Sequence, residues 1–303
     1  YFDFETKTFN TVFNPEYFFP TRIERNFNPN PNKEIVALLE KQLFVDPYTD
    51  VETGVFVKQK LSRAIAGTGF RDKSGVMLIG DPNSGKGVLT DAIILSCGDY
   101  IGTIDGGCLI NKPGADPILA NKEFLLARNN RILFTNELDP MAVLDGTKIQ
   151  KITSGGDVME GRILHGNNIK FIPQFTSFTF CNDKPKIAPL NDTDTGRIYY
   201  VNFPYKFTIK QITDATKDIF KKADVTIKDK LRTVEYMDAL FFILTENYLN
   251  VAPEAPLSVQ ASTDEWKSGD DFLENFYEHY EITKIVTDVV RPIDVFNWAK
   301  HNN

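Results

Sequence analysis

Apolar residues recur at helical spacing in three stretches of the chain. The stretch NKEIVALLEKQLF predicts one helix, and VFVKQKLSRAIAGTGF predicts a second that ends at Gly67 and Gly69. The third, VEYMDALFFILTENYL, lies near the C-terminus. One face of the first helix carries Ile35, Leu38, Leu39 and Leu43. Residues 1–32 are rich in Phe, Asn and Pro without a period, and predict an irregular arm.

Between these helices the pattern changes to short continuous apolar runs. The runs are residues 76–79, 132–134, 178–180 and 198–203. Runs of this length suit buried strands of a mostly parallel sheet. We expect no strand after Phe207, so the sequence predicts an α/β core flanked by helical segments.

The C-terminal part is predicted to be helical. Ser262 and Glu265 are spaced like a capping box that opens a helix carrying Trp266, and RPIDVFNWAKHNN predicts a last helix with Pro near its start. The helix that opens at this capping box would also carry the apolar residues Phe272, Leu273 and Phe276. We divide the chain into residues 1–70 (arm and helical segment), 71–210 (core) and 211–303 (C-terminal helical segment).

Composition narrows the classes of protein. The 303 residues contain no apolar run near the roughly 20 needed to cross a bilayer. The net charge of −7 argues against a general DNA-coating surface but leaves room for a local basic element. Cys97, Cys108 and Cys181 are widely spaced and form no CxxC pair, which favours a reducing, intracellular compartment. The chain opens on Tyr1, so we expect a fragment of a longer protein.

The segment VMLIGDPNSGKGVLTDAI joins a predicted strand to a predicted helix through a Gly-rich loop. The pattern GxxxxGK alone also fits an ordinary turn. The strand before it and the helix after it favour a phosphate site, because such a loop aims backbone N–H groups at phosphate oxygens. We expect ATP to be held by Gly80, Asp81, Pro82, Asn83, Ser84, Gly85, Lys86, Gly87 and Val88.

Gly87 stands where such loops usually place a Ser or Thr that ligates Mg²⁺. Mg²⁺ usually keeps several waters, so a water can fill this position. Thr90 lies one helical turn too far along, and Ser84 inside the loop is the better placed hydroxyl.

Three further segments supply polar residues beside predicted strands. RILFTNELDP ends a strand with Asn136, Glu137 and Asp139, and a carboxylate there can organise Mg²⁺ and polarise water, although acids also cap ordinary strand ends. SFTFCND ends in Asn182, which can hydrogen-bond the γ-phosphate. Arg197 precedes another strand and can spread phosphoryl charge, often from a neighbouring subunit.

This order of elements, with ITSGGDVMEGR between the acid and Asn182 and NFPYKF after the last strand, resembles superfamily 3 helicases. It is most similar to the helicase part of poxvirus-type primase-helicases of large DNA viruses, phages and plasmids. The resemblance runs over about residues 74–207 and more weakly beyond. SVQASTDEWKSGDDFLENF also resembles the region leading into that family's C-terminal winged-helix segment.

The resemblance implies an AAA+ core in which residues 80–87 are the Walker A loop. It also implies that Glu137 is the Walker B acid, Asn182 the sensor and Arg197 the arginine finger. Besides Gly87, the chain departs from the family at Asn136, where many relatives have a second acid, and at Gly196, where members often carry a paired Arg.

RILHGNNIKF predicts a hairpin with Gly166, Asn167 and Asn168 at its tip. Residues 145–186 hold six Lys or Arg against four acids, so the segment is locally positive. A solvated surface hairpin is the ordinary explanation. Family members instead place such a hairpin in the channel of a hexameric ring, on the DNA backbone. The candidate contacts are His165 and Lys170, supported by Lys148, Lys151 and Arg162.

The sequence therefore predicts an ATP- and Mg²⁺-dependent DNA helicase that acts in replication as a homo-hexameric ring. Its partners would be single-stranded DNA or a replication fork, and a primase domain on the same chain, in the cytoplasm or at a viral replication site. Two other classes stay open. A nucleotide kinase is favoured by Gly87 but lacks the expected Arg-rich lid, and a non-hydrolysing AAA+ scaffold would bind nucleotide only to hold a ring together.

Overall fold

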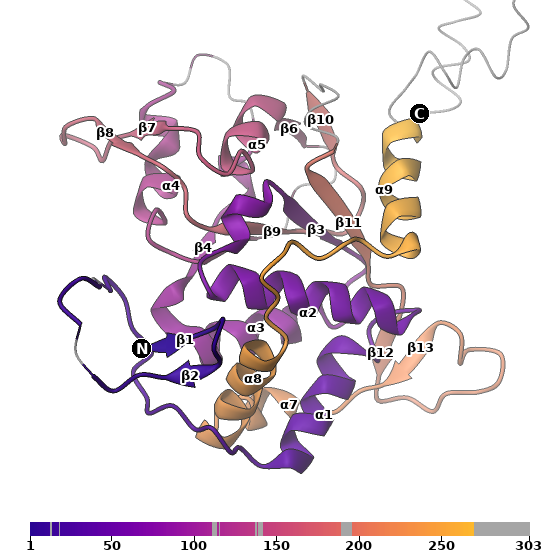
Figure 1. Ribbon diagram of the computed structural model, residues 1–303. Coiled ribbons are helices and arrows are strands. Elements are labelled where there is room, and N and C mark those ends of the chain that lie inside the picture. The colour runs from indigo at the N-terminus through magenta and orange to yellow at the C-terminus, as the bar shows by residue number, and fades with distance from the viewer. Residues whose placement is uncertain are drawn as a thin grey trace, which may run out of the picture. The chain divides into compact units, whose positions relative to one another are not determined.

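Five parallel strands form the central sheet (Figure 1). The computed structural model describes residues 1–12, 14–17, 19–110, 114, 116–136, 138, 142–188 and 196–269. The sheet has the order β11-β3-β9-β5-β4, and every neighbouring pair is parallel. Its strands are β3 (Gly75–Ile79), β4 (Ile101–Ile104), β5 (Ile132–Thr135), β9 (Thr176–Cys181) and β11 (Ile198–Asn202). The predicted α/β core with a parallel sheet is confirmed.

All five residues of β3 are buried, which explains why its sequence is a continuous apolar run. Val76 and Leu78 join a hydrophobic cluster with the helices on one face, while Met77 is buried on the other. The four predicted strands are confirmed to within two residues. The edge strand β4 was not predicted, because its residues IGTI form no continuous apolar run.

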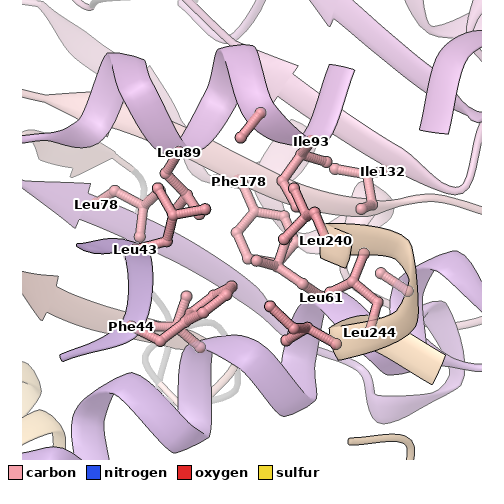
Figure 2. Close-up of a cluster of buried hydrophobic side chains, with 14 of the residues drawn as sticks. Leu43, Phe44, Leu61, Leu78, Leu89, Ile93, Ile132, Phe178, Leu240 and Leu244 are labelled. Carbon is pink, nitrogen blue, oxygen red and sulfur yellow. The ribbon is translucent and has the colours of Figure 1, made fainter. Parts of the chain in front are cut away.

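Four helices pack against one face of the sheet (Figures 1 and 2). They are α1 (Lys33–Phe44), α2 (Val51–Ile65), α3 (Lys86–Cys97) and α8 (Val234–Glu246). Figure 2 shows side chains of all four helices meeting residues of β3, β5 and β9. Helix α2 begins four residues before the apolar run that predicted it, because the Asp50 carboxylate caps it by accepting from the Thr53 N–H at 2.7 Å.

Shorter elements lie on the other side of the sheet in Figure 1. They are α4 (Lys122–Leu126), β6 (Val143–Asp145), α5 (Gly146–Ile152), β7 (Met159–Gly161), β8 (Ile169–Phe171) and β10 (Lys186–Ala188). β6 and β10 pair in parallel, and β7 and β8 pair antiparallel. The described residues also form four 3₁₀ turns, η1 (Gly69–Asp72), η2 (Gly98–Tyr100), η3 (Gly106–Cys108) and η4 (Leu119–Asn121).

The N-terminal arm is mostly irregular, as predicted. Its regular part is a small antiparallel pair, β1 (Phe2–Asp3) and β2 (Thr8–Phe9). The expectation of no strand after Phe207 is wrong. β12 (Lys206–Thr208) pairs in parallel with β13 (Phe220–Lys222), and the helix α7 (Ile227–Lys230) follows. Both strands have three residues and include lysines, so neither forms the continuous apolar run that predicts a buried strand.

The predicted capping box at Ser262 and Glu265 is also wrong. Helix α9 (Leu257–Gly269) begins five residues earlier, directly after Pro256, so Ser262 lies inside it. In the same helix the Thr263 hydroxyl accepts a hydrogen bond from the backbone N–H of Tyr200, at 3.1 Å, and so covers the edge of β11. Phe272, Leu273, Phe276 and the predicted last helix lie outside the described residues.

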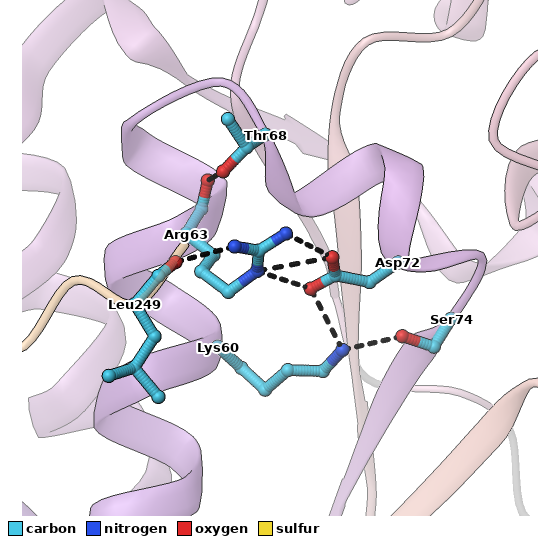
Figure 3. Close-up of polar contacts among 6 residues, drawn as sticks. All are labelled: Lys60, Arg63, Thr68, Asp72, Ser74 and Leu249. Carbon is cyan, nitrogen blue, oxygen red and sulfur yellow. Dashed lines mark hydrogen bonds and ion pairs between the residues drawn. The ribbon is translucent and has the colours of Figure 1, made fainter. Parts of the chain in front are cut away.

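A buried ion cluster of Lys60, Arg63 and Asp72 fixes the segment that leads into β3 (Figure 3). The guanidinium of Arg63 donates to both Asp72 oxygens, with Nη2–Oδ1 at 2.5 Å, and to the carbonyl of Leu249 at 2.5 Å. The Lys60 ammonium lies 2.6 Å from the Ser74 hydroxyl and 3.5 Å from Asp72. Burial lowers the pKa of Lys60, and the Asp72 carboxylate opposes that shift. The cluster therefore joins α2, η1 and the segment after α8 at the base of the sheet.

Among the described residues no helix combines the length and apolar character that crossing a membrane requires.

Candidate functional site

The Gly-rich loop follows the carboxyl end of β3, between the ends of its neighbours. Asn182 follows β9 and Asn136 follows β5, and parallel strands bring their carboxyl ends to one edge of the sheet. A cavity of about 570 Å³ lies at this edge. Its lining includes residues 81–88 together with Asn136 and Asn182. The structure thus brings the predicted phosphate loop and the predicted sensor into one cavity.

Two glycines of the loop are required by its backbone. Gly85 has a φ of 96°, in the left-handed region that favours glycine. A Cβ at Gly80 would lie 2.5 Å from the carbonyl oxygen of Phe203, and a Cβ at Gly85 would lie 3.2 Å from the Phe207 ring. The loop is therefore held close against the segment after β11.

Helix α3 begins at Lys86, with Gly85 as its N-cap and no side-chain cap. Lys86, Gly87 and Val88 of its first turn line the cavity. The first N–H groups of a helix lack intrahelical acceptors and carry partial positive charge, so this end suits an anion. The Lys86 ammonium donates to the Gly80 carbonyl and lies 3.4 Å from the Ser84 hydroxyl, which places its charge over the loop.

The structure shows what surrounds Gly87, where the usual Ser or Thr hydroxyl is missing, and how the two nearby hydroxyls are engaged. No atom lies within 4 Å of a Cβ placed on Gly87, so the position is open. The Thr90 hydroxyl donates to the Lys86 carbonyl at 3.0 Å and is engaged within the helix. Ser84 is buried beneath the Lys86 ammonium.

Charged pairs line the rim of the cavity. Lys206 lies 2.7 Å from the carboxylate of Asp81, and its hydrogen bond is the main cause that lowers the pKa of Asp81. Lys228 pairs with Asp91 at 3.0 Å. Both pairs are exposed to solvent, so they contribute little to the stability of the fold.

Of the predicted acid and the predicted finger, the structure describes only Arg197. Glu137 and Asp139 lie outside the described residues. Arg197 precedes β11, and its carbonyl accepts from the N–H of Gly75 at the amino end of β3. Arg197 therefore lies at the amino ends of the strands, whereas the loop lies at their carboxyl ends. The separation along the strand is roughly 13 Å at about 3.3 Å per residue. Within one chain, Arg197 is not brought to Lys86.

The predicted hairpin exists, but its paired strands differ from the prediction. β7 and β8 pair in the register that sets Glu160 opposite Lys170. The connection is residues 162–168, so Ile163 and Leu164 lie exposed in a loop instead of a strand. Within this connection the chain turns at His165, which has a φ of 62°.

The candidate DNA contacts fall into two groups. The side chains of Lys151, His165 and Lys170 are exposed. The other two are engaged, because Arg162 pairs with Asp116 at 2.5 Å and Lys148 donates to the carbonyls of Cys108 and Ile110. Lys148 therefore holds the fold around α5.

No protein-family model matches the chain. Two curated viral proteins are similar to it. One is named "Putative helicase V13", from Sputnik virophage, and is 30% identical over 308 residues, covering 99% of this chain and 39% of that protein. The other, "Putative helicase L207/L206" from Acanthamoeba polyphaga mimivirus, is 30% identical over 190 residues, 58% of this chain and 19% of that protein. The chain thus spans less than half of either relative.

Solved structures support the fold. An A-form apo structure of the NrS-1 C-terminal region matches with a TM-score of 0.51 at 15% identity, covering 94% of this chain and 64% of that one. Another apo structure of the same region gives 0.50 at 14% identity, covering 94% and 65%. At these identities the likeness extends to the fold alone. The fold and the loop define an α/β protein of the P-loop kind, and its curated relatives are viral proteins named as helicases.

Proposed function

We propose that this chain is the ATP-driven motor of a viral DNA helicase of superfamily 3 and AAA+ type. The observation that carries the proposal is the single cavity in which the Gly-rich loop, Lys86 and Asn182 meet at the carboxyl edge of a parallel sheet. The names of the two viral relatives support it.

The residues of the cavity fit a nucleoside triphosphate. Its volume of about 570 Å³ is that of a ligand site, and a side chain at Gly80 or Gly85 would collide with Phe203 or Phe207 and displace the loop. ATP supplies the phosphoryl group whose transfer to water would drive the motor. Lys86 and the loop amides hold the β and γ phosphates, and Asn182 donates to the γ-phosphate or orients the attacking water.

Two roles rest on the family resemblance. Glu137 would polarise the attacking water and hold Mg²⁺, directly or through water, with Gly87 leaving one further position to water. Arg197 would stabilise phosphoryl charge in a neighbouring subunit, and its place at the opposite edge of the sheet fits a role in trans. This arrangement requires a ring, which we propose is a hexamer.

DNA would contact the hairpin of β7 and β8 through Lys151, His165 and Lys170, with Arg162 at its base. In this proposal residues 1–70 form a helical collar, 71–210 the ATPase core and 211–303 the segment leading to a winged helix. We further propose that a primase domain lies elsewhere on the same chain and that the protein acts at a viral replication site.

The test is phosphate release from ATP with and without single-stranded DNA, together with unwinding of a forked duplex. The parent chain is expected to release phosphate faster with DNA, and Lys86→Ala to release none while remaining folded. Transfer of phosphate to a nucleotide would favour the kinase. ATP binding without release, in assembled rings with DNA, would favour the scaffold.

A further inference from the structure

The cavity beside the phosphate loop has a second wall built from parts of the chain far away in the sequence. Gln42 comes from α1, Phe207 from β12, and Asp224 and Ile227 from the segment after β13. A nucleotide whose phosphates lie on Lys86 must direct its base toward side chains other than the loop. These four residues offer two apolar side chains, one amide and one carboxylate.

Gln42 has an unsatisfied acceptor. Of the described residues that line the cavity, it is the one whose buried polar atom, Oε1, has no hydrogen-bond partner. A buried acceptor without a donor is costly, so a group that supplies the donor gains affinity. Less than 1 Å² of Oε1 is exposed, so a ligand N–H in the cavity would meet this oxygen after a small shift of the Gln42 side chain toward the cavity.

Asp224 fixes which way the Gln42 amide faces. The Gln42 Nε2 donates to Oδ2 of Asp224 at 3.3 Å. The same carboxylate accepts from the Thr226 N–H and hydroxyl at 2.9 and 2.6 Å, and from Lys230 at 2.9 Å. The hydrogen bonds from Thr226 and Lys230 hold the pKa of Asp224 below its usual range, so it remains ionised and only accepts. The amide nitrogen must face Asp224, and the oxygen must face away.

We propose that Gln42, positioned by Asp224, recognises the exocyclic amino group of the nucleobase and selects adenine nucleotides over 6-oxopurine nucleotides. An adenine N6–H donates to Gln42 Oε1. Hypoxanthine or guanine sets a carbonyl oxygen there, which leaves two acceptors facing each other. The inference rests on the proposed function, because it assumes that the loop holds a nucleotide's phosphates.

The test compares ATP with inosine triphosphate, which exchanges the 6-amino group for an oxygen. Both compete with a fluorescent nucleotide for the full 303-residue chain without DNA. We expect the parent to bind ATP about 10- to 100-fold more tightly than inosine triphosphate. This range corresponds to the free energy that is lost when a buried polar group is left unpaired. Gln42→Met keeps the length of the side chain and removes the amide, so the preference should fall to about twofold or less.

Three variants separate base recognition from other effects. Gln260→Met makes the same change at an exposed glutamine of α9 and should keep the parental preference. Lys86→Ala should weaken both nucleotides equally. Asp224→Asn should lower the ratio of affinities, because the amide is then free to turn, whereas a loss of fold alone weakens both ligands together.

The outcomes are distinguishable. Equal, tight binding of both nucleotides by the parent, or an unchanged ratio in Gln42→Met, overturns the assignment of Gln42 while leaving the phosphate site intact. Binding of neither nucleotide by the folded parent overturns the proposed function and this inference together.

Discussion

Gly87 occupies the helix position at which phosphate loops usually carry a hydroxyl side chain. The surrounding space is open, so the missing group is not excluded by packing. The local chain offers no replacement in Thr90, whose hydroxyl is bonded to the helix backbone. A water is therefore the simplest substitute ligand in the proposed site.

We predict that Gly87→Ser tightens the use of Mg²⁺. A Cβ at this position meets no neighbouring element, and the new hydroxyl would replace one water, so the Mg²⁺ concentration for half-maximal ATP hydrolysis should fall by roughly two- to tenfold, the effect of one added polar contact. Gly156→Ser is the matched control, since that glycine is equally open and lies outside the cavity. An unchanged or raised Mg²⁺ requirement in Gly87→Ser contradicts the water hypothesis.

At the scale of elements, the buried ion cluster holds the base of β3 while the phosphate loop leaves its other end. We predict that Asp72→Asn lowers the free energy of unfolding by about 3–5 kcal/mol, because it leaves two buried cations without a counter-charge. Urea unfolding measures the loss. Glu24→Gln breaks the exposed pair with Arg22 and should cost less than about 1 kcal/mol. Similar losses in the two variants would show that burial adds nothing to the cluster.

The hairpin of β7 and β8 carries the second prediction at this scale. Replacing His165 and Lys170 with Ala should weaken single-strand binding and flatten its salt dependence by roughly 0.7 for the Lys170 contact. Basal ATP hydrolysis should persist, because neither residue lines the cavity. Lys210→Ala, an exposed lysine outside the hairpin, is the control. If affinity and salt slope stay at parental values, the hairpin is an ordinary surface feature.

The elements also show how much of the fold can be predicted from the sequence. Buried strands such as β3 are found from their apolar runs, and the loop is found from Gly80, Gly85 and Lys86, because both signals are local. β4 escapes, since an edge strand with Gly102 and Thr103 has no such run. The contact of Gln42 with Asp224 joins residues 182 positions apart, and no local pattern indicates it. Ser262 misled because a Ser and a Glu three residues apart can also lie within a helix, and α9 starts earlier, directly after Pro256.

At the scale of the whole molecule, the phosphate loop lies at the carboxyl ends of the sheet's strands and Arg197 lies at their amino ends. If Arg197 acts on a neighbour, Arg197→Ala and Lys86→Ala chains should each be inactive alone and recover part of the ATPase activity when mixed. An interface with an intact Lys86 on one side and an intact Arg197 on the other is then complete. Mixed rings that form, as shown by mass measurement, and stay inactive at every ratio would contradict a role in trans.

The wall of the cavity is assembled from α1, the phosphate loop, Asn182 and the segment that holds Asp224. A nucleotide there would act as a removable crosslink between these stretches of chain, in addition to the hydrogen bond that already joins Gln42 to Asp224. By mass action, ligand at 100 times its dissociation constant adds about 2.7 kcal/mol to the free energy of unfolding. For a protein of this size we expect the thermal midpoint to rise by roughly 5–10 °C with ATP, and by much less in Lys86→Ala, which should bind ATP more weakly. Calorimetry would thereby report occupancy of the cavity even under conditions in which no ATP is hydrolysed.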